Sequence, residues 1–68
     1  MTIGEKILHI LKIKKMTQRD LAKKTHLSNA TINRYITDSR IPNAQNIKII
    51  CQTLDVSADW LLGIGEDF

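Results

Sequence analysis

The chain has 68 residues, of which 43% are hydrophobic and 4% aromatic, and its formal net charge is +3. A domain of this length buries only about 60% of the surface that its unfolded chain exposes, so its core cannot enclose a large cavity. No apolar run approaches 18 residues and no signal-like apolar segment is present, so neither membrane spanning nor secretion is indicated.

The charge is distributed unevenly along the chain. Residues 1–54 hold all ten lysines and arginines with three acidic residues, whereas residues 55–68 hold four acidic residues and no basic one. A basic body with an acidic end favours a polyanionic partner that meets one side of the domain. Charge alone does not separate this hypothesis from an ordinary, modestly basic protein.

The first predicted helix spans residues 3–14 or 3–15. Thr2 and Glu5 form a capping box, T-x-x-E, at its start. The helical stripe that follows consists of Ile3, Ile7, Ile10 and Lys14. Leu8 and Ile13 lie off this stripe, so they are either isolated exposed residues or part of a subunit interface.

Residues 17–36 predict two short helices joined by a tight turn. Thr17 is placed to cap a helix that begins near Gln18, and Ser28 is placed to cap the next one. Each hydroxyl can accept a hydrogen bond from a backbone N–H that is unpaired at a helix start. Only residues 25–27 separate the first helix from Ser28, which is the expected size of a helix-turn-helix connection.

The second helix of this pair has two chemically different faces. At 100° per residue, Ser28, Thr31, Ile32 and Tyr35 share one arc. The opposite arc consists of Asn29, Ala30, Asn33, Arg34 and Thr37. Amides and guanidinium groups read base edges in DNA, since arginine pairs with guanine and asparagine with adenine. The sequence therefore predicts one buried face and one DNA-reading face.

A turn-rich segment and two more helices complete the chain. Pro42 ends any continuation of the preceding helix, and Asn43 caps the next one. Ser57 caps a short helix over residues 58–62, which Gly63 ends. No segment alternates polar and apolar residues long enough to predict a strand. The expected fold is all-α, with five helices.

Helices this short are marginal alone in water, so they must fold around a shared core. The predicted core consists of Ile3, Ile7, Ile10, Leu21, Ala22, Leu27, Ile32, Ile47, Ile50, Leu54, Val56, Trp60 and Leu61. Residues 1–63 are expected to form the domain, and residues 64–68 a short acidic C-terminal tail.

The chain resembles the phage repressor and Cro-type helix-turn-helix family, whose members are XRE-like, lambda-repressor-like domains. The resemblance covers residues 3–62. It rests on I-G-E-K-I, M-T-Q-R-D-L-A, L-S-x-x-T-I-x-R-Y, R-I-P-N and L-D-V-S-A-D-W-L-L-G, in that order and spacing. It implies a compact five-helix DNA-binding domain whose second paired helix lies in the major groove.

The resemblance also implies roles for individual residues. Base contacts are implied for Asn29, Ala30 and Arg34. Asn33 lies on the same arc, and for this residue both a base contact and plain exposure to solvent stay open. The predicted phosphate contacts are Gln18, Ser28, Thr37, Arg40, Asn43 and Asn46. The sequence departs from the family at three positions usually held by glycine, which are His26, Asp38 and Asp55. We expect these residues to adopt positive φ, because His and Asp tolerate it better than most side chains.

Enzymatic chemistry is not indicated. Cys51, the single cysteine, excludes an internal disulfide and a multi-cysteine zinc site, and it fits a reducing cytoplasm. It lies on an apolar helical stripe, where a free cysteine behaves as a small hydrophobic residue. His9 and His26 lack companion ligands for a metal. No cofactor and no small-molecule ligand are expected.

Two classes of function remain. The first is a sequence-specific transcriptional regulator, a phage- or bacterial-type repressor in the cytoplasm, associated with the nucleoid through DNA. It would act as a homodimer on a palindromic operator whose half-sites lie about one helical turn apart. The second is an antitoxin-type module that uses the same helical body to bind another protein. The polar arc favours the regulator, since a protein-binding surface would carry aromatic or aliphatic anchors.

Overall fold

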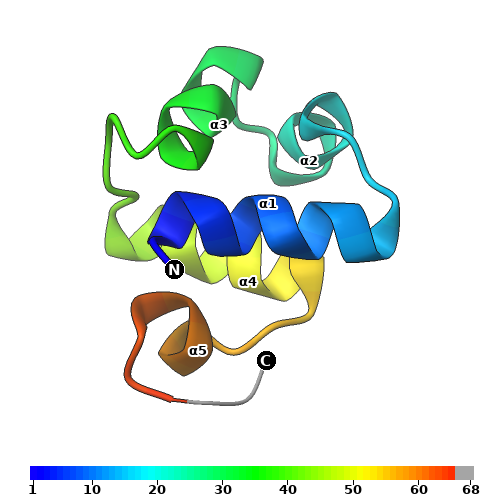
Figure 1. The fold of residues 1–68 in the computed structure, drawn as a ribbon. Helices are drawn as coiled ribbons and strands as arrows, with labels where there is room; N and C mark the ends of the chain where they lie inside the picture. Colours follow the sequence, from blue (N-terminus) through cyan, green and yellow to red (C-terminus); the bar gives the residue numbers. More distant parts are fainter. Residues whose placement is uncertain (66–68) are drawn as a thin grey trace.

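Residues 1–65 form five helices that begin where the capping residues predict, and the second of them includes Thr25, which was expected in the turn before Ser28. The structure, a computed structural model, describes residues 1–65. Its helices are α1 (Ile3–Lys14), α2 (Gln18–Thr25), α3 (Asn29–Ile36), α4 (Ala44–Leu54) and α5 (Ala58–Leu62), and this range contains no strand. α2 and α3 lie side by side on one side of α1, and α5 lies on the opposite side (Figure 1). The predicted all-α fold with five helices is confirmed.

Each helix begins at a polar side chain that accepts a hydrogen bond from the first turn. These N-cap residues are Thr2, Thr17, Ser28, Asn43 and Ser57, all at the predicted positions. α1 has the predicted capping box. α2 has a second one, not predicted, in which Thr17 and Asp20 each accept the other's backbone N–H.

The two capping boxes affect the acid stability of the fold. The backbone N–H of Thr2 lowers the pKa of Glu5, and the backbone N–H of Thr17 lowers the pKa of Asp20. Because each pKa is lower in the folded chain, both carboxylates stabilise the fold above their ordinary values of 4.5 and 3.8. That contribution is lost as the pH falls through the lowered pKa values.

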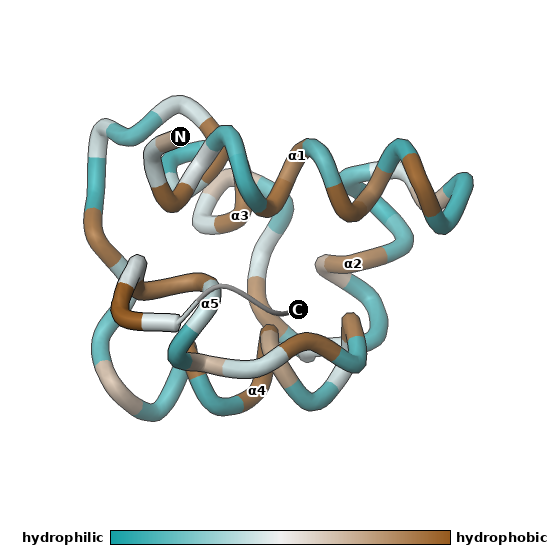
Figure 2. Tube along the Cα trace, turned by 60° about the horizontal axis from the view of Figure 1, so that its bottom comes forward, coloured by the Kyte–Doolittle hydropathy of each residue, from teal (hydrophilic) through white to brown (hydrophobic). Residues whose placement is uncertain are grey.

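All thirteen predicted core residues are buried or packed against the buried cluster. Leu11 is also buried, at 2% exposure, although it does not belong to the predicted core. Tyr35, on the arc of residues 28–35 that was predicted to be buried, is 4% exposed. Leu11 belongs to the same buried cluster as Ile7 and Ile10, so the apolar stripe of α1 is wider than predicted. Figure 2 shows hydrophobic and hydrophilic segments alternating along α1 and α4, as expected for helices that cover a shared core.

Thr25 is the buried polar residue of the core, with 3% exposure. Its hydroxyl donates to the carbonyl of Leu21 at 2.8 Å and accepts the backbone N–H of Leu27 at 3.4 Å. Thr25 thus joins the end of α2 to the turn before α3, and its polar atom is satisfied despite burial.

The three residues at glycine-like positions adopt the predicted left-handed conformation. His26 and Asp38 have φ of 60°, and Asp55 has φ of 56°. Lys15, at the end of α1, also has φ of 56°, which was not predicted. Each of these residues follows a helix or its C-terminal turn, where a left-handed residue satisfies the last carbonyls.

Glycine is required at position 4 because the backbone of α1 lies directly against the backbone at the end of α3. A Cβ on Gly4 would lie 2.5 Å from the carbonyl oxygen of Tyr35 and closer still to that of Ile36. No side chain fits there without moving one of the two helices. The absence of a side chain at Gly4 therefore sets the spacing of α1 and α3.

The chain continues to contact α5 after its last turn. The backbone N–H groups of Ile64 and Gly65 both donate to the carbonyl of Asp59, at 2.8 and 3.1 Å. The remainder of the predicted tail over 64–68, residues 66–68, lies outside the described residues. Among the residues that are described, no helix has both the length and the apolar character needed to cross a bilayer.

We expect His26→Gly to raise the melting temperature by a few degrees. The substitution relieves left-handed strain of about 1 kcal/mol, and in a domain of this size that corresponds to roughly 4–8 °C. Lys24→Gly is the matched control, since Lys24 is exposed inside α2 and glycine there costs about 1 kcal/mol. Thermal unfolding followed by circular dichroism measures both changes; an unchanged or lower melting temperature for His26→Gly contradicts the strain argument.

We expect Gly4→Ala to destabilise the fold by about 1–3 kcal/mol, because the new methyl group forces α1 away from α3. Ile13→Ala serves as the control, since Ile13 is 55% exposed on the same helix and a change there should stay within about 0.5 kcal/mol. Denaturant unfolding measures both variants. Equal stability of the two would show that α1 and α3 can separate without cost.

Candidate nucleic-acid interface

The predicted DNA-reading arc of α3 is open to solvent. Asn29, Ala30, Asn33 and Arg34 are all exposed. On the opposite arc, Ile32 is 1% exposed and packs into the core. No hydrogen bond or ion pair within residues 1–65 engages the Arg34 guanidinium. The amides and guanidinium of this face are therefore available to an outside partner.

The start of α2 lies beside the start of α3. The side-chain amide of Gln18 donates through Nε2 to the backbone carbonyl of Asn29 at 3.4 Å. This bond uses one of the two amide protons of Gln18, so the second remains for a partner. Gln18 is thereby held next to the N-terminal end of the α3 face.

Ser28 lies at the same end of that face. Its hydroxyl oxygen accepts the backbone N–H of Thr31 at 3.0 Å and lies 2.8 Å from the Thr31 hydroxyl. When Thr31 donates to Ser28, the Ser28 proton is available for an oxygen on another molecule. Gln18 and Ser28 form the first pair of donors at the edge of the α3 face.

A second group of donors lies between α3 and the start of α4. Arg40, Asn43 and Asn46 line one groove, together with Tyr35. The Asn43 side-chain oxygen accepts the backbone N–H of Asn46 at 2.8 Å, which leaves the Asn43 amide protons available. The Asn46 amide donates to the Tyr35 hydroxyl at 2.8 Å, so the Tyr35 proton is free to donate.

Thr37 differs from the other predicted phosphate contacts. Its hydroxyl donates to the carbonyl of Asn33 at 2.9 Å and so caps the end of α3. A phosphate oxygen only accepts hydrogen bonds, and the Thr37 proton is already engaged within the protein. Within the domain the Thr37 hydroxyl is thus engaged at the end of α3, and its predicted phosphate contact stays a prediction.

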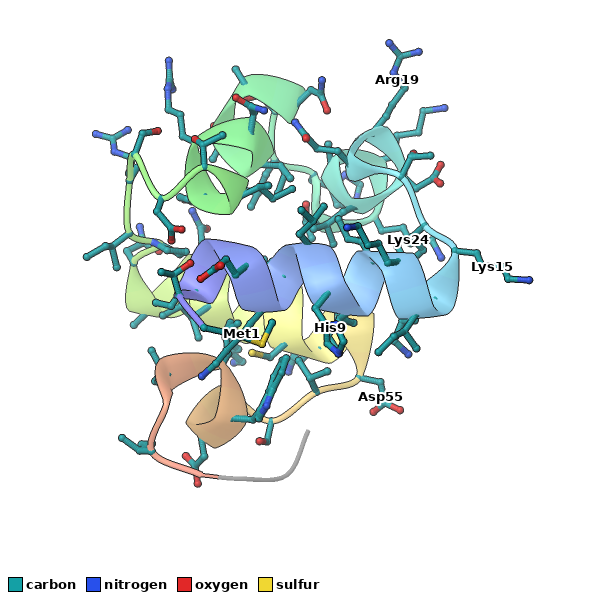
Figure 3. The ribbon with its side chains drawn as sticks, viewed as in Figure 1. Met1, His9, Lys15, Arg19, Lys24 and Asp55 are labelled. Atoms are coloured by element: carbon teal, nitrogen blue, oxygen red, sulfur yellow. The ribbon has the colours of Figure 1, made fainter. Side chains whose placement is uncertain are left out.

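Two polar residues of this region were missed by sequence reasoning. Tyr35 was assigned to the buried face, yet its hydroxyl reaches the groove beside Asn46. Arg19 follows Gln18 in the first turn of α2 and is exposed. Figure 3 shows Arg19 projecting outward on the side of the molecule where α2 and α3 lie. The position of Arg19 in the first turn after the cap Thr17 was the sequence signal that could have identified it.

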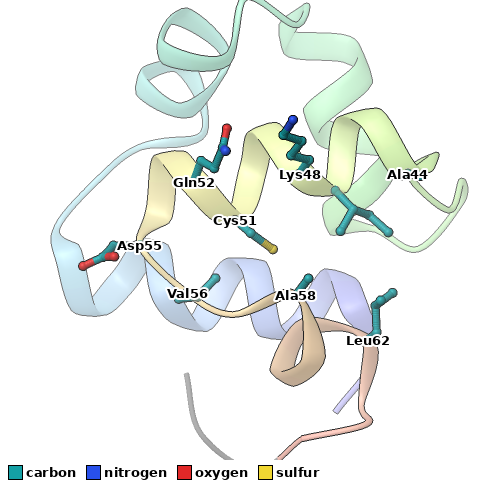
Figure 4. Close-up of a pocket in the computed structure, with 9 residues that line it drawn as sticks. Ala44, Lys48, Cys51, Gln52, Asp55, Val56, Ala58 and Leu62 are labelled. Carbon is teal, nitrogen blue, oxygen red and sulfur yellow. The ribbon is translucent and has the colours of Figure 1, made fainter.

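Other kinds of site are poorly supported. Within residues 1–65, no group of three His, Cys, Asp or Glu residues is placed to bind a metal ion. Burial raises the pKa of the Cys51 thiol, which keeps it protonated and weakly nucleophilic. An open, mainly apolar groove lies between α4 and α5, bordered by Ile47, Cys51 and Leu62 (Figure 4). The polar residues that border it are Lys48, Gln52 and Asp55.

Comparison with solved structures gives close matches. The crystal structure of the P22 c2 repressor protein in complex with synthetic operator 9T superposes with a TM-score of 0.89 at 29% identity, covering 96% of this chain and 98% of that one. The solution structure of the DNA-binding domain of the same repressor, residues 1–76, superposes with a TM-score of 0.87 at 31% identity, covering 91% of this chain and 82% of that one.

Sequence comparison gives relatives with the same kind of domain. The HTH-type transcriptional regulator DicA of Escherichia coli K12 is 33% identical over 67 residues, which are 98% of this chain and 50% of DicA. The uncharacterized HTH-type transcriptional regulator YobD of Bacillus subtilis 168 is 27% identical over 63 residues, which are 93% of this chain and 56% of YobD. The chain spans about half the length of these curated relatives.

The helix-turn-helix family matches residues 7–61, which contain all of α2, α3 and α4. Together with the superposition on the P22 c2 repressor, this match shows that the chain belongs to the XRE-type helix-turn-helix family.

Proposed function

We propose that the chain is a sequence-specific DNA-binding transcriptional regulator, a repressor that reads the major groove with α3. The observation that carries the proposal is the layout of the interface. An exposed face of amides and a guanidinium is bordered by hydrogen-bond donors at both ends. The similarity to a repressor solved with its operator supports double-stranded DNA as the partner.

Each group on the face has a matching base edge. Arg34 can bond guanine O6 and N7, and Asn29 and Asn33 can bond adenine N6 and N7. Ala30 offers a methyl group to the thymine methyl. These four residues are the proposed base contacts, which decide which sequence is bound.

The flanking donors are the proposed phosphate contacts, which fix the position of α3 in the groove. They are Gln18, Ser28, Arg40, Asn43 and Asn46. Arg19 and the Tyr35 hydroxyl extend this set, and Thr37 acts through its cap on α3. Helix N-termini at α2, α3 and α4 add backbone N–H groups with positive dipole ends.

The proposed regulator acts without enzymatic chemistry or a cofactor. It works in the cytoplasm on nucleoid or prophage DNA, as a homodimer like Cro-type proteins, and represses by occupying promoter DNA. Because one α3 covers only a few base pairs, two copies one helical turn apart are needed for a site of useful specificity.

Substitutions at the interface should separate base contacts from phosphate contacts. Arg34→Ala is expected to relax preference at one base pair by about 1–3 kcal/mol, because a bidentate contact is lost. Gln18→Ala should weaken binding to all sequences by a similar factor, on the order of fivefold. Arg40→Ala should reduce the slope of log affinity against log salt by about 0.9.

Fluorescence anisotropy with labelled duplexes at several salt concentrations measures these effects. Gln52→Ala is the control, because Gln52 is an exposed amide on α4 that borders the apolar groove away from α3. Unchanged selectivity in Arg34→Ala would show that the proposed register of α3 is wrong. Absence of any salt-sensitive DNA binding would favour the antitoxin-type interaction module instead.

Selection of binding sites from random DNA tests the dimer. We expect a palindromic consensus whose half-site centres are about 10 base pairs apart. A single, non-repeated half-site as the product would contradict the homodimer proposal. The same selection provides the operator for measurements on variants.

A further inference from the structure

Asp38 has a left-handed backbone and a side chain that binds a different helix. Its φ of 60° is a conformation in which most side chains are strained. One carboxylate oxygen accepts the backbone N–H of Gly4 at 2.9 Å, and the other accepts the hydroxyl proton of Thr2. The Gly4 N–H lies in the first turn of α1 and has no partner within its own helix.

These bonds extend the capping box of α1. The Thr2 hydroxyl oxygen accepts the backbone N–H of Glu5 at 3.1 Å, and the Glu5 carboxylate accepts the backbone N–H of Thr2 at 2.8 Å. The Asp38 carboxylate therefore lies among hydrogen-bond donors at the positive end of the α1 dipole. We call this arrangement of Asp38, Thr2 and Gly4 the α1–α3 link.

On its other side, Asp38 belongs to a segment wound onto the end of α3. The backbone N–H groups of Ser39 and Arg40 donate to the carbonyl of Arg34 at 3.0 and 3.2 Å. The backbone N–H of Asp38 itself donates to the carbonyl of Tyr35 at 3.2 Å. The segment that carries Arg40 is thus attached to α3 through its backbone and to α1 through the Asp38 side chain.

We propose that Asp38 is a positioning residue for DNA binding. The α1–α3 link holds the segment between α3 and α4 in the conformation that presents Arg40 and Asn43 to phosphates. It also keeps the Asp38 carboxylate bound to α1, away from the negatively charged DNA backbone. This inference rests on the proposed DNA-binding surface of α3 and adds a residue that touches no DNA.

Asp55 shows what a left-handed aspartate does when its side chain has no such partners among the described residues. Asp55 has nearly the same φ as Asp38, and its carboxylate makes no hydrogen bond within residues 1–65. Glycine at Asp55 therefore removes only strain. Glycine at Asp38 removes the strain together with two hydrogen bonds, so stability alone mixes two opposed effects and DNA affinity must be measured as well.

The test compares Asp38→Gly and Thr2→Val with the control Asp55→Gly, using the operator obtained by selection. All are measured below the melting temperature of the least stable variant. We expect Asp38→Gly and Thr2→Val each to weaken operator binding on the order of three- to tenfold, because a less ordered segment lowers the binding-competent fraction. Asp55→Gly should leave affinity unchanged. In the double variant of Thr2 and Asp38 the two losses should be less than additive.

Two further measurements separate positioning from general loss of structure. Asp38→Asn keeps an oxygen for the Gly4 N–H and tolerates positive φ, so it should restore most of the affinity. Amide hydrogen exchange at Gly4 should accelerate in Asp38→Gly while exchange at the core residue Ile50 stays slow. Operator affinity of Asp38→Gly equal to that of Asp55→Gly, or strictly additive losses in the double variant, would overturn the inference.

Failure of this inference is distinguishable from failure of the proposed interface. If Arg34→Ala loses selectivity while Asp38→Gly binds normally, only the positioning role of Asp38 is wrong. If Arg34→Ala also binds with unchanged selectivity, the α3 surface itself is wrong.

Discussion

The close approach of two backbones controls the geometry of this domain. Gly4 in α1 lies against the carbonyls of Tyr35 and Ile36 at the end of α3, with no room for a Cβ. α3 carries the exposed polar face, and the position of that face on the body depends on this contact. The core residues then hold the crossing in place, and the hydrogen bonds from Thr2 and Gly4 to Asp38 join the same two helices at the surface.

Hydrogen bonds within the domain already hold both ends of the exposed polar face of α3. Gln18 joins the start of α2 to that of α3, and Thr37 caps the last turn of α3. Such prior ordering lowers the conformational entropy lost on binding, so more of the contact energy appears as affinity. A domain of this size has a small net stability, and the same hydrogen bonds contribute to it. A substitution that removes one of them therefore lowers both the stability of the fold and the affinity for a partner.

The residues with positive φ show how one backbone requirement can be met in different ways. His26 and Asp55 occupy left-handed positions without a described hydrogen bond from their side chains. Asp38 occupies the same conformation while its carboxylate bonds to another helix. Aspartate at a left-handed position thus has a different consequence at Asp38 and at Asp55, which depends on what lies within reach of the side chain.

Local sequence determined much of this protein. Capping residues and apolar spacing predicted the five helices, and the arc of Asn29, Asn33 and Arg34 predicted an exposed polar face, because both features depend on neighbours along the chain. Tertiary structure alone decided the burial of Leu11, the groove contact of the Tyr35 hydroxyl and the bond between Asp38 and Gly4. These depend on distances between residues far apart in sequence, which are set by helix packing and which no local pattern encodes.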